Sequence, residues 1–317
     1  MSDMTYRRLG SSGLVVSTIG LGCNNVGRKL DADGTRAVVD AAFDAGITLF
    51  DTADIYGTPH GASEELLGLA LKGRRDEIVL ATKFGMDMAG MNGADRGARG
   101  SRGYILRAVE ASLRRLDTDY IDLYQIHAPD AETPIEETLA ALDDLVRAGK
   151  VRYLGNSNFA GWQLADADWT ARAAGHSAFI SAQNQYSLLH RGVEAEIIPA
   201  CEHFGLGFLP FFPLASGLLS GKYRRGQKAA AGTRLAQERY QPWLDGADWD
   251  LIEALTAFGA ERGHSLLDVA IAGLAARPAV TSVIAGATTA DQIRANAAAG
   301  TWDLTPQETA DLDALLR

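Results

Sequence analysis

Short β-branched or apolar runs alternate with longer segments of helical period along most of this chain of 317 residues. The alternation begins at Thr18 and is the order expected of repeated βα units. Eight such runs can be counted, which predicts eight strands. They are TIGLG (18–22), ITLFDTA (47–53), EIVLATKFG (77–85), IDLYQIH (121–127), VRYLGNSN (151–158), FISAQNQY (179–186), GFLPFFPL (207–214) and TSVIAG (281–286).

Amphipathic segments separate these runs, as at residues 63–72, 101–116, 135–148 and 266–276. Their apolar residues recur at three- and four-residue spacing, so each predicts a helix that covers one strand from outside. Length alone would also allow two domains. Eight strands with eight helical segments and no break in composition instead favour a closed parallel barrel over an open doubly wound sheet. The sequence predicts an α/β fold, a single (β/α)8 TIM barrel domain over residues 1–317.

The segments outside the repeated βα units are an N-terminal stretch and two long connections, and the sequence predicts a position for each of them. The stretch YRRLGSSGLVVSTIG (6–20) reads as two short strands around residues 11–13, and we expect this β-hairpin to cap the bottom of the barrel, its N-terminal end. Two long connections rich in glycine and arginine, residues 85–103 and 222–249, follow predicted strands on the C-terminal side. Barrels carry their binding loops there, so both connections are candidate lids over a ligand.

Composition narrows the class of partner. A formal net charge of −10 and a pI near 5.1 argue against nucleic acid or an anionic membrane as the main partner, because either would repel the chain. Cys23 and Cys201 lie far apart without a CxxC or Cys/His cluster, so neither a disulfide framework nor a metal site is expected. No apolar leader and no run near 18 apolar residues is present. We expect a cytoplasmic protein with a small-molecule partner.

Three motifs come close to known signatures and are set aside. GLGCNNVG (20–27) has Asn25 where a dinucleotide fingerprint needs glycine, and GLLSGKY (217–223) is one residue short of a phosphate loop. RGARGSRG (96–103) is too brief for an RNA-binding segment and lacks aromatic residues, so a solvated loop is the better interpretation. No hydrolase motif such as GxSxG or HExxH occurs.

Four side chains that can take part in acid–base chemistry lie at or just beyond predicted strand ends. Asp51 closes the second strand, Lys83 lies near the end of the third, His127 ends the fourth, and Tyr56 follows Asp51 by five residues. In a parallel barrel these ends surround one opening, so the four can be neighbours. Each residue taken alone would more often have a structural role. Asp51 could bond to the backbone, Tyr56 could pack in the core, Lys83 could extend its amine to solvent, and His127 could be a hydrogen-bonded core histidine. Together they predict a catalytic cluster.

These residues stand in FDTADIYG (50–57), ATKFG (81–85) and DLYQIHAPD (122–130), which closely resemble the catalytic segments of the aldo-keto reductase superfamily. The resemblance runs nearly end to end. It includes RLGSSGLVVSTIGLG (8–22), SLRRLDTDYIDLYQIH (112–127), LGNSNF (154–159), QNQYSLLHR (183–191), PLASGLLSGKY (213–223) and VIAGATTADQIRANAAA (283–299).

The resemblance implies that a nicotinamide cofactor gives hydride to a carbonyl carbon while Tyr56 donates a proton to the oxygen. A free tyrosine has a pKa near 10, so an adjacent ammonium, here Lys83, is needed to stabilise its phenolate. Asp51 would pair with Lys83 and keep it protonated. His127 would hydrogen-bond and orient the carbonyl oxygen, where negative charge develops in the transition state.

The same resemblance assigns the cofactor-binding residues. Those for the nicotinamide end supply amide, hydroxyl or aromatic groups, those for the pyrophosphate supply a loop and positive charge, and those for the adenosine end lie where the last barrel helix starts. The nicotinamide set is Ser157, Asn158, Gln183 and Phe211, although Phe211 could instead be a core residue. Gly22, Cys23 and Asp51 are further cofactor-binding residues. The pyrophosphate set is Pro213, Leu214, Ser216, Gly217, Leu218, Lys222 and Arg234, and the adenosine set is Gly286, Thr288, Gln292 and Asn296.

The cofactor preference and the role stay open at this point. NADP(H) is expected, but many relatives carry a basic residue where this chain has Ala287 and Gln292, which leaves Arg294 close by, so NAD(H) is possible. A cofactor-sensing regulatory subunit, as in the similar potassium-channel β-subunits, is the alternative to an enzyme. A barrel isomerase or lyase would leave the cofactor-matching segments unexplained. The substrate could be an aldehyde, a ketone or a sugar, in either direction of reaction.

Overall fold

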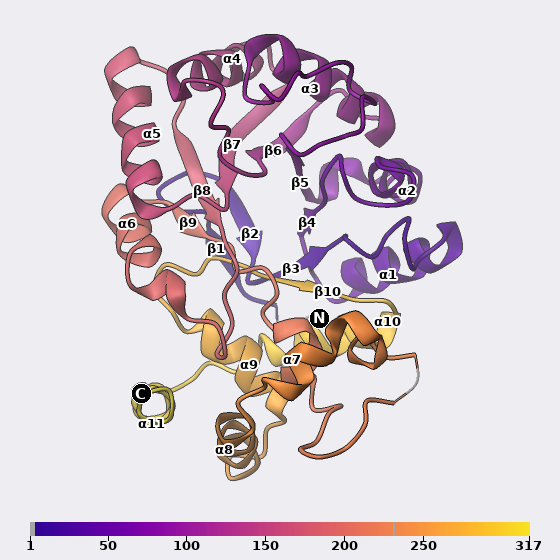
Figure 1. The fold of residues 1–317 in the computed structure, drawn as a ribbon, viewed down its shortest axis with the longest axis vertical. Helices are drawn as coiled ribbons and strands as arrows, with labels where there is room; N and C mark the ends of the chain where they lie inside the picture. Colours follow the sequence, from indigo (N-terminus) through magenta and orange to yellow (C-terminus); the bar gives the residue numbers. More distant parts are fainter. Residues whose placement is uncertain (1–3, 231) are drawn as a thin grey trace.

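The computed structural model describes residues 4–230 and 232–317, and these form a ring of parallel strands with helices outside it (Figure 1). The strand order is β10, β3, β4, β5, β6, β7, β8, β9. Each strand lies within one of the predicted runs, which confirms the eight-strand prediction. The bounds are β3 (Ile19–Gly22), β4 (Leu49–Asp51), β5 (Val79–Phe84), β6 (Ile121–Ile126), β7 (Val151–Ser157), β8 (Phe179–Gln183), β9 (Gly207–Phe208) and β10 (Val283–Gly286).

The first and last strands of this order meet, so the sheet closes into a barrel. Phe208 of β9 makes a parallel bridge with Val280, just before β10. Its amide donates to the Ala279 carbonyl at 2.8 Å, and its carbonyl accepts from the Thr281 amide at 2.9 Å. The (β/α)8 TIM barrel is therefore confirmed.

Strand β9 is much shorter than the run of residues 207–214 that predicted it. Pro210 and Pro213 have no N–H to donate to a ladder, and Phe212 has a φ of +53°, outside the extended region. The regular strand therefore ends after two residues. The chain still continues along its neighbours as far as Phe211, because the amides of Leu209 and Phe211 donate to the Ala182 and Asn184 carbonyls at 2.9 and 3.1 Å.

The helices occupy the predicted segments and are amphipathic as expected. Helix α4 buries Leu139, Leu142 and Leu145 on one face, and its first turn carries Glu136 and Glu137, which suit the positive end of the helix dipole. The bounds are α1 (Ala32–Asp44), α2 (Ala62–Ala70), α3 (Arg102–Leu116), α4 (Ile135–Arg147), α5 (Gly161–Ala174), α6 (Ile197–Phe204), α7 (Gln241–Asp245), α8 (Trp249–Ala260), α9 (Leu266–Ala275), α10 (Ala290–Ala299) and α11 (Pro306–Leu315). No helix of the described residues is long and apolar enough to cross a membrane.

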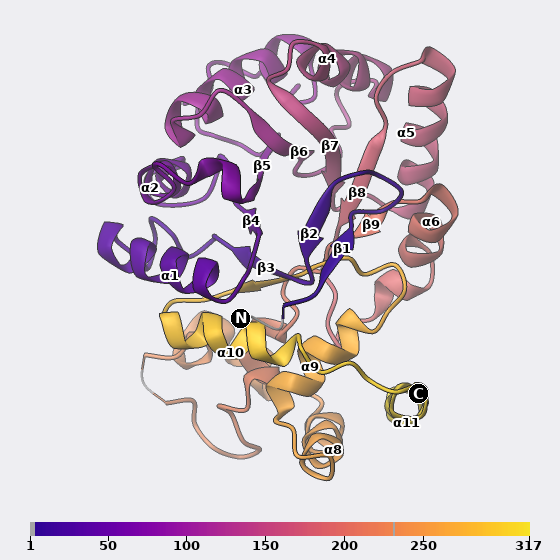
Figure 2. The same ribbon diagram turned by 180° about the vertical axis from the view of Figure 1, so that it is seen from behind.

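The predicted hairpin is present as β1 (Tyr6–Arg8) and β2 (Val15–Ser17), antiparallel, and lies across the bottom of the barrel in Figure 2. Leu9 and Val16 are fully buried in one cluster with inward residues of the strands, such as Leu49 and Leu123. Gly10 has a φ of +59°, and a Cβ there would lie 2.4 Å from the Gly205 carbonyl oxygen. The hairpin thus closes the barrel at the N-terminal ends of the strands, as predicted.

The two long connections differ from each other. Residues 85–101, all described, form no helix or strand between β5 and α3. The connection predicted at residues 222–249 instead contains the short helices η4 (Arg234–Ala236), η5 (Glu238–Tyr240) and α7. It is therefore a partly helical segment rather than an irregular loop. It follows β9 and the 3₁₀ segment η3 (Ala215–Ser220).

Candidate active site

A cavity of about 630 Å³ opens at the C-terminal ends of the strands. Most of the sequence-predicted site residues line it. Two do not: Lys83 is completely buried beneath it, and Leu218 is 4% exposed and packs in the hydrophobic core. The predicted residues that line the cavity are Gly22, Cys23, Asp51, Tyr56, His127, Ser157, Asn158, Gln183, Phe211, Pro213, Leu214, Ser216, Gly217, Lys222, Arg234, Gly286, Thr288, Gln292 and Asn296.

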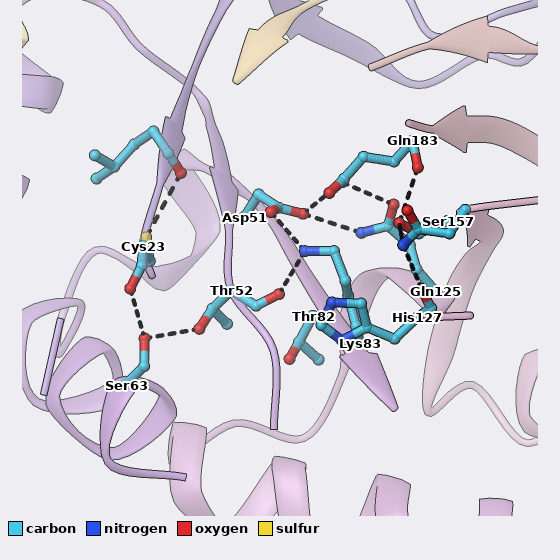
Figure 3. Close-up of polar contacts among 12 residues, drawn as sticks. Cys23, Asp51, Thr52, Ser63, Thr82, Lys83, Gln125, His127, Ser157 and Gln183 are labelled. Carbon is cyan, nitrogen blue, oxygen red and sulfur yellow. Dashed lines mark hydrogen bonds and ion pairs between the residues drawn. The ribbon is translucent and has the colours of Figure 1, made fainter. Parts of the chain in front are cut away.

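The floor of the cavity holds a buried ion pair. The Lys83 Nζ donates to Asp51 Oδ2 at 2.6 Å and to the Thr52 carbonyl at 2.9 Å (Figure 3). The side chains of Lys83 and Asp51 are 0% and 4% exposed. Neighbouring strands β5 and β4 carry the two residues, so the barrel itself fixes the pairing that the sequence predicted.

Asp51 has two further partners on its other oxygen. Gln125 Nε2 and Gln183 Nε2 donate to Asp51 Oδ1 at 3.1 and 2.9 Å, and Gln183 also donates to Gln125 Oε1 at 3.2 Å. Sequence analysis missed Gln125, although a polar residue inside the apolar run IDLYQIH was a usable signal. The Gln183 amide was assigned to the nicotinamide, but here its nitrogen is bonded to the carboxylate and the Gln125 oxygen.

Tyr56 and His127 stand above this ion pair and face the cavity. Their rings meet edge to face with centroids 5.7 Å apart, and the Lys83 Nζ lies 5.3 Å from the centroid of the Tyr56 ring. Both side chains are half-buried. The four residues predicted from strand ends therefore meet at one place.

The electrostatics of the four groups have distinct causes. Burial alone would lower the pKa of Lys83, but the Asp51 carboxylate and Tyr56 together raise it above its ordinary value. Burial raises the pKa of Tyr56, and the Lys83 ammonium opposes this without overcoming it. The predicted effect of Lys83 is present, but the net direction is upward. Tyr56 is a neutral phenol.

His127 is also uncharged. Burial, with the Lys83 ammonium as the second cause, lowers the pKa of its imidazole to about 3. Its Nδ1 is buried without a hydrogen-bond partner within residues 4–230 and 232–317. A neutral imidazole next to a neutral phenol can hydrogen-bond one incoming oxygen without placing a second positive charge beside Lys83.

The nicotinamide end of the predicted cofactor site lies at the ends of β7 and β8. The Ser157 hydroxyl donates to the Gln183 carbonyl at 2.8 Å, and Asn158 Nδ2 donates to the His127 carbonyl at 2.9 Å. The Phe211 ring is half-buried, lines the cavity and meets the Phe212 ring at 5.2 Å, so it is not a core residue.

An unusual backbone follows Phe211. Phe212, Ala215 and Ser216 have φ values of +53°, +45° and +58°, and Gly217 has +106°. Residues other than glycine seldom adopt this region, and such strain gathers where backbone amides are arranged around a ligand. The turns are closed by backbone hydrogen bonds, because the amides of Ala215 and Gly217 donate to the Phe212 and Leu214 carbonyls at 2.9 and 2.8 Å. Lys222 lines the same part of the cavity.

The adenosine end of the predicted site lies where β10 leads into α10. The Thr288 amide and hydroxyl donate to Gln292 Oε1 at 2.8 and 3.2 Å, and Asp291 pairs with Arg294 at 3.0 Å. Asn296 is 4% exposed. This end therefore presents polar groups, with the charge of Arg294 partly balanced by a carboxylate.

Several lining residues were missed by sequence analysis. Asn25 Nδ2 donates to the Ala287 carbonyl at 3.2 Å, which ties the loop after β3 to the loop after β10. The two asparagines directly after the first predicted strand were the available signal. The missed residues are Asn24, Asn25, Lys29, Ser220, Tyr223, Gly232, Thr233, Leu267, Ile284, Ala285, Asp291 and Ala295.

No cluster of metal-binding side chains occurs in the part of the chain that the structure describes. Residues 4–230 and 232–317 contain no group of three or more His, Cys, Asp or Glu side chains that could hold a metal ion. Cys23 lines the cavity, but burial, with the Asp51 carboxylate as the second cause, raises the pKa of its thiol well above the usual range. It is an unreactive neutral thiol.

Comparisons with known proteins identify the family of this chain. A sequence model described as "Aldo/keto reductase family" matches residues 18–317. "Uncharacterized oxidoreductase YrpG" of Bacillus subtilis (strain 168) is 40% identical over 304 residues, covering 92% of this chain and 89% of that protein. "Probable voltage-gated potassium channel subunit beta" of Oryza sativa subsp. japonica is 37% identical over 302 residues, covering 92% and 90%. "L-glyceraldehyde 3-phosphate reductase" of Escherichia coli (strain K12) is 33% identical over 311 residues, covering 93% and 87%. The chain therefore belongs to the aldo/keto reductase family of oxidoreductases.

Proposed function

We propose that this protein reduces aldehydes or ketones to alcohols, or catalyses the reverse reaction, with NADP(H) as cofactor and Tyr56 as general acid or base. The observation that carries the proposal is the arrangement of Lys83. Its Nζ lies 2.6 Å from Asp51 Oδ2 and 5.3 Å from the Tyr56 ring centroid, directly beneath a cavity that Tyr56 and His127 face.

The residues around the cavity fit a nicotinamide dinucleotide. One continuous space of about 630 Å³ runs from amide and hydroxyl groups at Ser157 and Asn158, past the left-handed backbone at Ser216 and Gly217, to the start of α10. The positive charge of Lys222 in the middle part suits a pyrophosphate, and the aromatic ring of Phe211 suits a flat heterocycle. A bound nicotinamide would supply the hydride.

The chain's own residues would handle the proton. Tyr56 is a neutral phenol, so its hydroxyl can give a proton to an oxygen on which negative charge develops. The phenolate that remains is stabilised by the Lys83 ammonium, which Asp51 holds in place and keeps protonated. After reduction, the proton returns to Tyr56 from solvent.

His127 would orient the substrate oxygen. Because its imidazole is neutral, it can donate one hydrogen bond to the carbonyl oxygen and does not compete with Tyr56 as a strong acid. Two donors directed at the oxygen stabilise the transition state more than the uncharged carbonyl of the ground state. The buried amides of Gln125 and Gln183 donate to one oxygen of the Asp51 carboxylate, which leaves the other oxygen to accept from Lys83 during the reaction.

We propose NADP(H) rather than NAD(H) from the polar groups at the α10 end. Thr288, Gln292 and Asn296 line the cavity there, and the amides at the helix N-terminus attract a phosphate. Arg294 is the nearby cation, although its pairing with Asp291 weakens the field that a 2′-phosphate would meet.

A cofactor-binding regulatory subunit is the second candidate, and the relative described as a potassium-channel subunit motivates it. The intact set of Asp51, Tyr56, Lys83 and His127 favours an enzyme, because a sensor needs no proton donor. We further propose that residues 1–317 act as one domain in the cytoplasm, with a small carbonyl or alcohol as substrate and no nucleic acid or membrane as partner.

The test is NADPH oxidation against a panel of aldehydes, ketones and sugars, run beside NADH. Protein fluorescence titrations give the Kd of each cofactor independently of turnover. We expect turnover of at least one carbonyl class and tighter binding of NADPH than of NADH. Tight cofactor binding without turnover of any carbonyl would contradict the enzyme and favour the regulatory role, and equal Kd values would contradict the NADP(H) preference.

A further inference from the structure

A fully buried polar contact joins the catalytic strands to the long connection of residues 85–101. Asn92, in the middle of this connection, is 4% exposed, and its Nδ2 donates to Asp54 Oδ2 at 2.9 Å. Asp54 is completely buried. Most of the connection is exposed or half-buried, and the Asn92 amide is a buried polar anchor in its middle, whereas Gly100 is held at its end by Thr138, whose hydroxyl donates to the Gly100 carbonyl at 2.9 Å.

The acid end of this contact belongs to the catalytic region. Asp54 lies three residues after Asp51 and two before Tyr56, and its amide donates to the Lys83 carbonyl at 3.0 Å. Its backbone is therefore fixed to β5 next to the catalytic lysine. A group bound to the Asp54 side chain is placed relative to Tyr56 through a very short stretch of chain.

The amide end holds the connection at several points. The Asn92 carbonyl accepts from Arg107 Nε at 3.2 Å, and Asn92 Nδ2 also lies 3.5 Å from the Tyr104 hydroxyl. That hydroxyl in turn donates to the Met86 carbonyl at 3.4 Å. One buried side chain thus connects the centre of the connection with its first residues.

Those first residues border the proposed substrate side. The amide of His127 donates to the Phe84 carbonyl at 2.8 Å, and an added Cβ at Gly85 would lie 3.8 Å from that same amide. The described lining of the cofactor cavity comes from the loops after the other strands and includes nothing from residues 85–101. The first residues of the connection therefore lie beside the backbone of His127, which lines the cavity, and Met86 among them is partly exposed.

We propose that Asp54 and Asn92 form a latch that positions residues 85–101, and with them Met86, as the substrate-side wall of the active site. This inference rests on the proposed function. Both are positioning residues for carbonyl binding, acting through the connection, and neither touches the reacting atoms.

The charges around Asp54 explain why the latch uses an amide. Glu64, also buried, accepts from Arg115 Nε at 2.7 Å and from the Thr82 hydroxyl at 2.6 Å. Arg115 Nη1 also donates to Asn92 Oδ1 at 3.5 Å, so this arginine contacts the amide of the latch, while its ion pair is with Glu64 rather than with Asp54. Asp54 Oδ1 has no hydrogen-bond partner in the described parts of the chain. Burial, with Glu64 as the second cause, raises the pKa of Asp54 to about 8. A neutral carboxyl that accepts from an amide can be replaced by asparagine.

The test compares four variants of the full chain. Asn92→Ala and Asp54→Leu remove the latch, Asp54→Asn keeps an acceptor oxygen, and Asp95→Ala removes a half-buried ion-pair partner of Arg99 in the same connection. For each we measure kcat and KM for a carbonyl, the Kd for NADPH, and hydrogen–deuterium exchange of residues 86–99.

We expect Asn92→Ala and Asp54→Leu to raise KM about tenfold, as loss of one buried hydrogen bond allows, with a smaller change in kcat and an unchanged Kd for NADPH. Exchange of residues 86–99 should become faster. Asp54→Asn should restore KM toward the wild-type value, and Asp95→Ala should leave it there.

Two results would overturn the latch. One is an unchanged KM and unchanged exchange in Asn92→Ala. The other is an equal loss of kcat, KM and cofactor binding in Asn92→Ala, Asp54→Leu and Asp54→Asn, which would indicate general destabilisation. If the wild-type protein reduced no carbonyl, the proposed function would fail, and the exchange measurement alone would decide the latch.

Discussion

Replacing Lys83 with methionine perturbs the centre of the site with little change in shape. Methionine keeps an unbranched apolar stem of similar length and removes only the ammonium. In the native protein this ammonium lies 2.6 Å from Asp51 Oδ2 and 5.3 Å from the centroid of the Tyr56 ring. The substitution therefore affects both Tyr56, the proposed proton donor, and the buried carboxylate of Asp51, and the two effects can be measured separately.

The catalytic effect follows from Coulomb's law. At 5.3 Å and an effective dielectric constant of about 20, the ammonium stabilises a negative charge on Tyr56 by about 3 kcal/mol. Losing that stabilisation in the transition state corresponds to a fall in kcat of about a hundredfold. Lys83 does not line the cavity, so the Kd for NADPH should stay unchanged. Steady-state kinetics give kcat, single-turnover kinetics at saturating cofactor give the rate of the chemical step, and fluorescence titration gives the Kd.

The stability effect comes from Asp51, which would retain only the amides of Gln125 and Gln183. A buried carboxylate without its cation costs about 3–5 kcal/mol in the free energy of unfolding, measured by urea denaturation. Adding Asp51→Asn to Lys83→Met should recover most of this stability without recovering activity. Lys150→Met, which removes a partly exposed ion pair with Glu110, is the matched control and should change neither quantity much. Turnover by Lys83→Met within about tenfold of the wild type would refute the reasoning.

Three further predictions concern protonation and packing. Because burial and then Lys83 lower the pKa of His127 to about 3, kcat/KM should show no histidine limb between about pH 5 and 8, and a limb abolished by His127→Gln would contradict this. Burial and then Glu64 raise the pKa of Asp54 from 3.8 to about 8, so the folded state keeps a proton that the unfolded state releases. Stability in urea should fall as the pH rises through this range, and Asp54→Asn should flatten the fall; parallel pH profiles would count against it. Gly10→Ala should destabilise the hairpin by about 2–4 kcal/mol in thermal unfolding, because its φ is +59° and the new Cβ would meet backbone, whereas Gly13→Ala should have little effect; equal losses would be the contrary result.

The features that could be predicted from the sequence depend on local pattern. Eight apolar runs at βα spacing determine a closed barrel, and in such a barrel the residues at strand ends must meet. Asp51, Lys83 and His127 were therefore identifiable as neighbours from their positions alone. The hairpin was identifiable because it was left over once eight strands were assigned.

The remaining features depend on contacts between distant segments. The bond of Gln125 to Asp51 depends on the register that places Gln125 opposite Lys83, and period-2 alternation does not fix register between strands. The contact of Asn92 with Asp54 spans 38 residues of sequence. The positive φ of Phe212 and Ser216 is imposed by tertiary packing against local preference. Asn92 gave no signal by type or spacing, and the polar Gln125 in its apolar run gave no indication of its partner.

The central claim is that Tyr56 is the proton donor in a hydride transfer. The most direct measurement is single-turnover oxidation of bound NADPH by a carbonyl substrate in Tyr56→Phe, with Tyr6→Phe at the exposed hairpin as control and the Kd for NADPH measured for each protein. Phenylalanine keeps the ring and removes the hydroxyl. The account predicts a rate at least about a hundredfold lower in Tyr56→Phe, unchanged cofactor binding, and a wild-type rate in the control. A wild-type rate in Tyr56→Phe would contradict it.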